Sequence, residues 1–310
     1  MIHPAWLIGL TLSAQVPVPD AANEAPSALR ASVQAALDQE AERLAERVGT
    51  LMRDGQVDAA KGVSPWIPPI LPDDGPTRFQ PLPEVVPAPI KPAAQDPEAS
   101  KIRVSTARIL FDLARQAAAP GAGQNFALAD RCLRAVLERD PGHAEARRLL
   151  GFVAFEGGWA TPYAAGLLKQ TLVLHPKFGW VPDDWGPRLD RGELPGTKFV
   201  RGKPTEWLPA DQADALRSGW NSSQDRFQQP WKITTEHFEI QTNVPLSEVI
   251  VFGRRLERLH EVFFSMFADL IGRDRLPLAQ RFANGGAKPA KPTIKYSVWY
   301  FAERSQYIAH

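Results

Sequence analysis

Apolar residues recur at helical spacing in the first part of this chain. The stretch begins after Pro26 and Ser27, and its apolar positions are Leu29, Val33, Leu37, Leu44, Val48 and Leu51. Residues three or four positions apart lie on one face of a helix, and a glycine commonly follows the last turn. The pattern therefore predicts one long amphipathic helix over residues 26–55, ending at Asp54 and Gly55.

Three shorter apolar faces lie between residues 107 and 173. They are Ile109, Leu110, Leu113 and Ala114; then Ala129, Leu133, Val136 and Leu137; then Ala146, Leu149, Leu150, Val153 and Ala154. Pro141 and the pair Leu150 and Gly151 fall where a tetratricopeptide repeat of about 34 residues has its closing proline and its Leu-Gly pair. Leu172 to Pro176 resembles the segment that ends at Pro141. Residues 101–176 are thus predicted to form a tetratricopeptide-like helical region with a second, degenerate repeat.

The period changes after residue 230. Trp231 to Thr242 is rich in β-forming residues, and Phe238 and Ile240 alternate with polar ones, which predicts a strand. A strongly amphipathic helix follows, with apolar positions at Val249, Phe252, Leu256, Leu259, Phe263, Met266, Phe267 and Leu270. A second strand is predicted from Thr293 to Phe301, and Ala302 to His310 is typical of the first turns of a helix. Residues 231–310 therefore predict a β-α-β unit that is incomplete as a domain.

Prolines and tryptophans separate these parts. The chain has 29 prolines and nine tryptophans, and the prolines of residues 56–100 predict an extended linker. Apolar residues such as Trp66, Phe79 and Val85 suggest that part of this linker lies along a folded surface. Residues 177–230 form a tryptophan-rich connecting region with short strands. The fold class expected overall is α+β, mainly α.

Four tryptophans are candidates for a binding surface: Trp159, Trp180, Trp185 and Trp207. Aromatic rings in loops can stack on sugars, but they also form the core of small irregular regions. We favour the second interpretation, and glycan binding stays open as an alternative.

The N-terminus suggests export. An apolar run from Ala5 to Ala14 has the length of a signal-peptide core and is too short to span a bilayer. We expect residues 1–14 to be a signal peptide, residues 15–25 to be disordered, and the protein to be periplasmic or extracellular. Lys and Arg are absent before the run, so a short buried helix or a different start codon stays open.

Charge and cysteine content narrow the classes of partner. The formal net charge is +1, and the basic residues are scattered along the chain. The chain therefore has no strong positive electrostatic field that would attract nucleic acid, and we do not expect it to bind nucleic acid. We also expect no membrane span once the signal peptide is removed. Cys132 is the only cysteine, on an apolar helical face, and we expect it to be an inert packed thiol.

No catalytic constellation is complete in the sequence. His260 to Phe264 departs from His-Glu-x-x-His because Phe264 stands where the second zinc ligand belongs. His237 and His310 add no ligand spacing, and adjacent Asp183 and Asp184 are typical of a turn. We assign no catalytic, cofactor-binding or metal-binding residue.

Several motifs together resemble a known family. They are Phe178 to Pro182, Thr235 to Asn243, Phe267 to Asp269 and Tyr300 to Arg304. In this order, after tetratricopeptide-like helices, they look like the exported bacterial family named domain of unknown function fifteen-seventy, which is related to gluzincin, or peptidase-MA-like, metallopeptidases. The resemblance implies a zinc-binding His-Glu-x-x-His helix further downstream than residue 310. Zinc is thus expected only with a catalytic continuation.

These observations lead to one main hypothesis. The chain is expected to be a non-catalytic scaffold that binds protein or peptide through its helical region, attached to a truncated peptidase-like domain. The alternatives are the N-terminal part of a zinc metallopeptidase and a glycan-binding protein.

Overall fold

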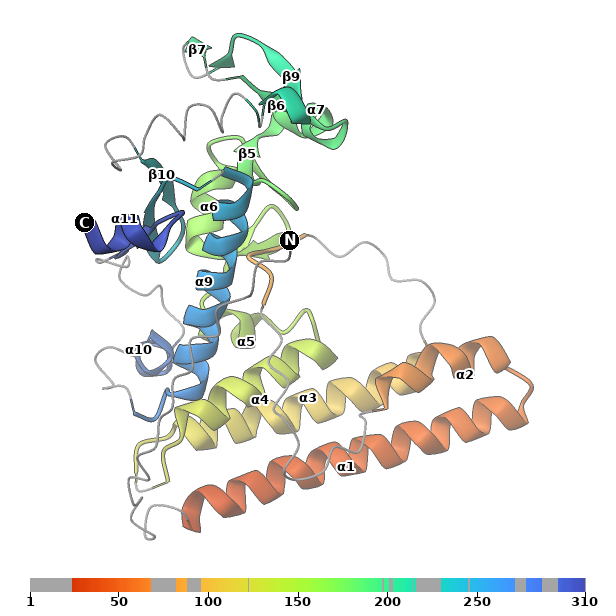
Figure 1. Ribbon diagram of the computed structural model, residues 1–310. Coiled ribbons are helices and arrows are strands. Elements are labelled where there is room, and N and C mark those ends of the chain that lie inside the picture. The colour runs from red at the N-terminus through yellow and green to blue at the C-terminus, as the bar shows by residue number, and fades with distance from the viewer. Residues whose placement is uncertain are drawn as a thin grey trace.

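The computed structural model has a mixed α+β fold built mainly of helices, as the sequence predicts (Figure 1). It describes residues 24–67, 82–87, 96–121, 123–196, 198–200, 203–213, 215, 230–244, 246–270, 277–285 and 295–309. The expected signal peptide, and all but the last two residues of the segment expected to be disordered, lie outside the described residues. Within the described residues, no helix combines the length and the apolar character that crossing a membrane requires.

The N-terminal half is a layer of helices. Helix α1 covers Glu24–Arg53, close to the predicted range, and α2 covers Val57–Val63. Gly55, with φ of +71°, turns the chain between them, and the Gln56 N–H closes the turn on the Leu51 carbonyl at 2.8 Å. The expectation of a linker from residue 56 is therefore wrong at its start, because Ala60 and Val63 pack with Leu44 and Leu51 of α1.

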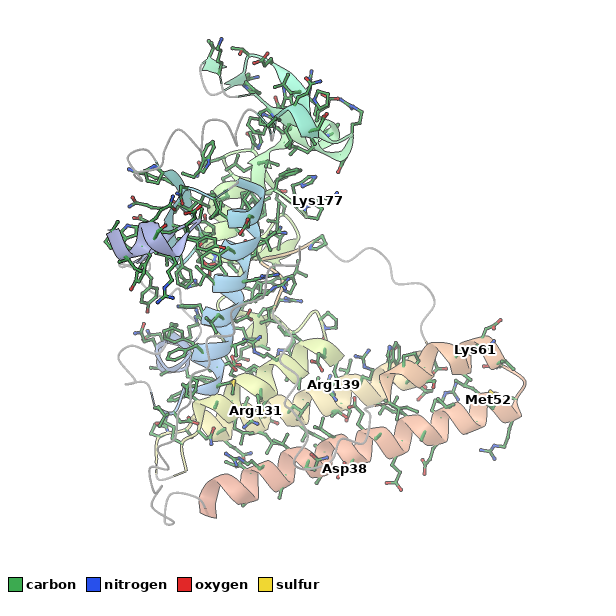
Figure 2. The ribbon with its side chains drawn as sticks, viewed as in Figure 1. Asp38, Met52, Lys61, Arg131, Arg139 and Lys177 are labelled. Atoms are coloured by element: carbon green, nitrogen blue, oxygen red, sulfur yellow. The ribbon has the colours of Figure 1, made fainter. Side chains whose placement is uncertain are left out.

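Helices α3 (Pro97–Ala118) and α4 (Phe126–Arg139) complete the helical layer, with α3 between α1 and α4. Asp96 caps α3 by accepting from the Ala99 N–H, and Arg47 of α1 pairs with it at 2.6 Å. Leu110 and Leu133 are fully buried between the helices. Arg139 of α4, labelled in Figure 2, also forms an ion pair with the buried Glu40 of α1 at 2.6 Å.

The third predicted helix ends early. Helix α5 covers Ala144–Leu149, and Gly151 has φ of +98°, which few residues other than glycine adopt. Strands β2 (Val153–Phe155) and β3 (Gly158–Ala160) follow as a hairpin whose turn residues Glu156 and Gly157 both have positive φ. Val153 and Ala154 are therefore strand residues, and the prediction of a third helix through them is wrong.

The proposed second repeat is also wrong. Helix α6 (Pro162–Leu168) is followed by a hairpin of β4 (Leu172–His175) and β5 (Gly179–Pro182), so the segment that resembles the end of a repeat is a strand. The remaining elements of this part are η3 (Asp183–Trp185), α7 (Gly186–Asp190), β6 (Glu193–Pro195), β7 (Phe199–Val200), β8 (Lys203–Pro204) and β9 (Trp207–Pro209). The connecting region thus has the short strands that the sequence predicts, and residues 210–213 are helical.

The proline-rich segment contacts the folded part, as expected. The short 3-10 helix η2 (Ser64–Trp66) extends α2, and strand β1 (Val85–Val86) pairs with β3 in a sheet ordered β1-β3-β2. Trp180 of β5 donates from Nε1 to Glu84 at 3.0 Å. The last part of the expected linker belongs to α3, because that helix begins at Pro97.

The C-terminal part is an α/β unit. Strands β10 (Trp231–Thr234) and β11 (Phe238–Thr242) are antiparallel, so the single strand predicted from Trp231 to Thr242 is in fact a hairpin that turns at 235–237. Helix α9 (Leu246–Met266) leads to α10 (Pro277–Ala283), then β12 (Tyr296–Tyr300) and α11 (Arg304–Ala309). Strand β12 is parallel to β11, so the predicted β-α-β unit is present, with α10 as an additional helix.

Candidate functional site

One side of helix α9 contacts both the strands of the middle region and the helices of the N-terminal layer. Arg254 and Glu261 are spaced one heptad apart, which places them along the same side of the helix, and Ala268 lies in the turn that follows it. Arg254 donates to the carbonyl of His175 at 2.9 Å, at the end of β4. Glu261 lies 2.8 Å from Arg134 of α4, and Ala268 is buried in the core of the helical layer. Figure 1 shows α9 running from the strands to the helices α3 and α4.

The contact between α9 and α4 is polar as well as apolar. Asp130 accepts from Arg134 at 2.7 Å and from the hydroxyl of Ser265 at 2.6 Å. Glu261 accepts from Arg134 and from the Leu82 N–H at 3.0 Å. Burial would lower the pKa of Arg134, but the two carboxylates outweigh it and raise that pKa above its ordinary value. The guanidinium therefore stays charged and holds α9 on α4.

The end of α9 is fixed by a helix cap. Asp269, in the turn after the helix, accepts from the backbone N–H of Phe126 at 2.6 Å and of Ala127 at 3.3 Å. These are the first N–H groups of α4, which have no partner within their own helix. A carboxylate at this end also interacts favourably with the helix dipole. The motif Phe267 to Asp269 thus has a structural role in joining the two parts.

The side of α9 that faces away from these contacts carries an apolar stripe. We use this name for Leu259, Phe263, Met266, Phe267 and Leu270. Leu259 and Met266 are each 61% exposed, and Leu270 is 82% exposed. Leu259, Phe263, Met266 and Leu270 follow one another at spacings of four, three and four, the pattern of a helix that packs against another helix.

The stripe is a clear departure from what the sequence predicts. An amphipathic helix ordinarily buries its apolar face, and the first part of this one does so, since Val249, Phe252 and Leu256 pack on β11 and β12. Further along, the buried side turns to Glu261, Ser265 and Ala268. The pair Asp130 and Arg134, four residues apart on α4, was the sequence signal for this polar contact and was missed.

A cluster of ionisable side chains lies where α9 meets the turn between β10 and β11. The rings of His237 and His260 are stacked with centroids 3.8 Å apart. Glu257 lies 2.7 Å from Nδ1 of His237 and accepts from its backbone N–H at 2.8 Å. Burial and the neighbouring His237 lower the pKa of His260 to about 4, although Glu257 acts in the opposite sense. His260 is therefore neutral at pH 7.

Two half-buried carboxyl groups, Glu84 and Glu236, interact with Glu257. Burial raises the pKa of Glu84 and of Glu236, and the repulsion from Glu257 adds to this in both. Burial alone would raise the pKa of Glu257, but hydrogen bonds from His237 and Thr235 bring it below its ordinary value. No group of three or more His, Cys, Asp or Glu among the described residues could hold a metal ion. Stacked rings also cannot aim their nitrogens at one shared ion, so this cluster fits a structural role.

The four tryptophans named from the sequence do not form one platform. Trp180 packs with Ala160 and Ala164 around β3 and α6, where Trp159 also lies on β3. Trp185 and Trp207 belong to a different cluster, in which their rings meet edge to face at 5.3 Å. All four are half-buried. This placement supports their interpretation as cores of irregular regions.

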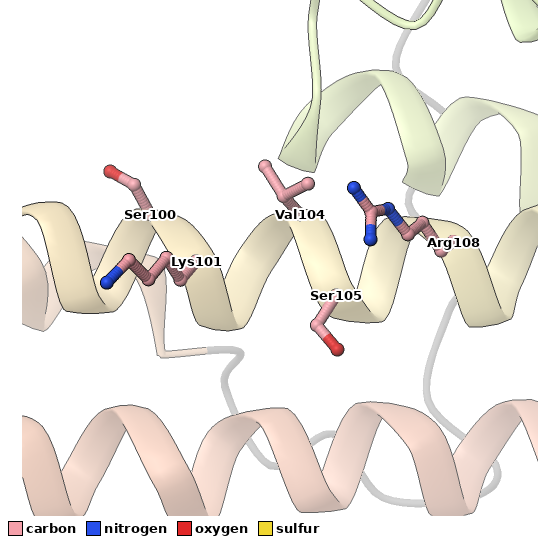
Figure 3. A pocket seen from close by; sticks show the side chains of 5 residues that line it. All are labelled: Ser100, Lys101, Val104, Ser105 and Arg108. Atoms are coloured by element: carbon pink, nitrogen blue, oxygen red, sulfur yellow. The ribbon is translucent and has the colours of Figure 1, made fainter.

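Two further features carry no chemistry of their own. A shallow hollow on α3 is lined by Ser100, Lys101, Val104, Ser105 and Arg108 (Figure 3). Lys101 is paired with Glu98 at 2.7 Å. Cys132 is buried as predicted, and burial raises the pKa of its thiol to about 11, which keeps it protonated. His310 lies outside the described residues.

Comparisons with known proteins add no assignment. No family model matches the chain, and neither the curated proteins nor the solved structures contain a significant match.

Proposed function

We propose that this protein is a helical scaffold that binds another polypeptide through the apolar stripe of α9. The observation that carries the proposal is the exposure of this stripe along the last two turns of α9 and the turn that follows, while the opposite side of the helix is fixed. Monomeric proteins rarely leave a contiguous apolar patch of this kind in water, and such patches commonly mark binding sites. The contacts of Arg254, Glu261 and Asp269 support the proposal because they hold the helix in place before a partner arrives.

A photo-reactive amino acid at Met266 tests this function. The protein carrying it is expressed in its own cells, irradiated and analysed for cross-linked adducts. We expect one discrete adduct from position 266 and none from the same group at Glu42, an exposed position on α1. Adding Phe263→Glu to the Met266 variant should reduce the adduct at least tenfold. Absence of any adduct, or an equal yield from Glu42, would reject the function.

A second candidate is the N-terminal part of a zinc metallopeptidase of the gluzincin type. The observation that favours it is the parallel pairing of β11 and β12 across α9, which is the β-α-β unit that the family resemblance implies. The cluster at His237 and His260 does not fit a zinc ion, so the ligands would come from a continuation of the chain. Elemental analysis of the 310-residue protein and of any longer gene product distinguishes the two candidates. Stoichiometric zinc only in a longer product supports the peptidase.

Export to the periplasm or the exterior is part of the proposal and rests on the apolar run from Ala5 to Ala14. Mass spectrometry of the protein from cell fractions provides the test. An exported chain that starts at Gln15 would support it, and a cytoplasmic chain that keeps Met1 would contradict it.

A further inference from the structure

Residues 82–87 lie on the folded part of the chain in the way that a bound peptide lies on its receptor. Strand β1 pairs antiparallel with β3 on the side opposite β2, with Val85 across from Ala160. The Thr161 N–H donates to the carbonyl of Glu84 at 2.9 Å. Addition of an extended segment to the edge strand of a sheet is a common mode of peptide recognition.

Three half-buried side chains fix this segment in place. Leu82 packs against the core of the helical layer, and its N–H donates to Glu261 at 3.0 Å. Glu84 accepts from Nε1 of Trp180 at 3.0 Å. Val85 packs on the small apolar cluster between β3 and α6. The folded part therefore recognises the backbone of the segment, one carboxyl group and two apolar side chains.

Two exposed prolines prepare the segment for this contact. Pro83 and Pro87 restrict the residues before them, Leu82 and Val86, to extended conformations. A segment that is already extended loses less conformational entropy when it docks. Proline also has no N–H to donate, so Pro83 and Pro87 limit the length of the ladder. The segment is thus short, extended and suited to binding as a separate unit.

The segment makes its contacts with distant parts of the chain. Glu84 and Trp180 are 96 residues apart, and Leu82 and Glu261 are 179 residues apart. Local chain geometry therefore does not enforce the docking, and the segment binds as a tethered ligand. We infer that the edge of β3 is a peptide-binding site, that residues 82–87 occupy it as an internal ligand, and that a separate extended polypeptide of the same chemistry competes for it. The residues named in these contacts are not those of the apolar stripe, so the inference goes beyond the proposed function.

The contacts define the chemistry of the partner. It has an apolar residue, a glutamate two positions later and two β-branched residues directly after the glutamate, as in Leu82 to Val86. The glutamate side chain reaches the indole N–H of Trp180, and an aspartate at the same backbone position is one methylene shorter. Burial raises the pKa of Glu84, although the hydrogen bond from Trp180 acts in the opposite sense. The site therefore requires an oxygen acceptor more than a negative charge.

Peptide binding to the full 310-residue protein is the first test. A dye-labelled peptide with the sequence of residues 80–89 is titrated with the wild type and with the double variant Glu84→Ala/Val85→Ser, which weakens the internal ligand and leaves the site unchanged. Because the internal ligand competes, fluorescence anisotropy should show about tenfold tighter binding to the double variant. A peptide of the same composition in scrambled order should not bind. Equal affinities for the two proteins, or no binding to the folded double variant, would overturn the inference.

A milder variant keeps this test available if the double variant does not fold, which circular dichroism determines. Val86→Ala shortens one side chain of the internal ligand and should raise the affinity for the peptide about threefold. An affinity equal to that of the wild type would again count against competition.

A double-mutant cycle locates the peptide on the protein. Glu84→Ala in the peptide should weaken its binding to the double variant about tenfold, and Glu84→Gln, which keeps an oxygen acceptor, should weaken it by less. When Trp180→Phe removes the indole N–H from the protein, the peptides with glutamate and alanine should bind equally well. A difference that survives Trp180→Phe would place the peptide elsewhere and overturn the assigned site.

Two controls separate this site from other occupants and from the apolar stripe. Phe263→Glu should leave the affinity for the peptide unchanged, and a loss would place the peptide on the stripe and overturn the inference. Sedimentation equilibrium compares the wild type with the double variant. A wild-type dimer that disappears in the double variant would assign the site to residues 82–87 of a second copy, and a separate partner would then be wrong.

Discussion

The helical layer and the C-terminal α/β unit place their apolar residues differently. In the layer of α1, α3 and α4, residues such as Leu44, Leu110 and Leu133 are fully buried. Among the described residues, fifteen large apolar side chains are exposed, and ten of them lie between residues 251 and 308. The layer thus buries most of its large apolar residues in a core that Ala268, Leu278 and Ala279 complete, while the α/β unit has apolar surface for which the described part of the chain provides no cover.

This difference indicates that one region mainly stabilises the fold and the other mainly binds a partner. The three-stranded sheet has α9 on one face, and β12 lies at its edge with Tyr296 and Trp299 about half exposed. We therefore expect the helical layer to hold the fold together and the α/β unit to provide the binding surface. Four experiments test this division, from the largest expected effect to the smallest.

Truncation of a leucine to alanine should lower the free energy of unfolding much more in the helical layer than in the apolar stripe. Leu133→Ala removes a fully buried side chain of α4 and should lower the free energy of unfolding by about 2–5 kcal/mol. Leu270→Ala removes a side chain that is mostly in water and should change it by less than about 0.5 kcal/mol. Urea unfolding of both variants measures the contrast. Equal losses would show that the stripe is buried in solution.

The polar contact between α9 and α4 should be the main link between the regions. Arg134→Ala leaves Asp130 and Glu261 without their cation at a largely buried contact, and the loss should be about 2–4 kcal/mol. Lys101→Ala, which breaks the exposed pair with Glu98, should cost less than about 0.5 kcal/mol. Chemical denaturation monitored by circular dichroism compares them. If Arg134→Ala behaved like Lys101→Ala, the link would be apolar.

Acid should destabilise the α/β unit through His260. Its pKa is about 4 in the folded protein against 6.5 ordinarily, so the unfolded chain binds the proton more readily. This contribution is unchanged above pH 6.5 and destabilises the fold progressively as the pH falls toward 4. The full shift corresponds to about 3 kcal/mol, and the partial exposure of the ring reduces this to about 1–2 kcal/mol.

His260→Gln should remove that part of the pH dependence. The raised pKa values of Glu84 and Glu236 act in the opposite direction, since the fold gains stability as these groups bind protons. Unfolding at pH 7.5 and pH 5 should therefore show a smaller loss, or a gain, in His260→Gln than in the wild type. A variant with the same acid sensitivity as the wild type would rule out His260 as the cause.

The cap at the start of α4 should have the smallest effect. Asp269→Ala removes the acceptor for the Phe126 N–H and should lower the free energy of unfolding by about 1 kcal/mol. Asp269→Asn keeps an oxygen acceptor and should lose less. Thermal unfolding of the two variants gives the comparison. An unchanged midpoint for Asp269→Ala would show that α4 starts without this cap in solution.

Elements with a long, regular pattern were predicted well. Helices α1, α3, α4 and α9 follow from their apolar spacing, because helical hydrogen bonds are local and repeat along the chain. The strand pairing that replaced the third predicted helix was not foreseen, because Val153 and Ala154 suit a helical face as well as a strand. The positive φ angles at Gly151, Glu156 and Gly157, together with the distant strand β1, decided the outcome.

The candidate site was predicted only in part. Leu259, Phe263, Met266, Phe267 and Leu270 were recognised as one apolar face, but their exposure was not predicted. The sequence pattern states which residues share a side of a helix and contains no information on what lies next to that side. The stacked pair His237 and His260 had no spacing signal either, since a turn between two strands brings them together.

The sequence by itself determined the mainly helical α+β class, the amphipathic helices, the buried Cys132 and the β-α-β order of the last part. These depend on local geometry, in which neighbours three or four residues apart share a side. The tertiary structure alone decided that α9 is anchored through Glu261 and Asp269 and turns its apolar stripe to water. That choice arises because Glu261, on the opposite side of α9, pairs with Arg134, and Asp269, in the turn after α9, accepts from the first N–H groups of α4.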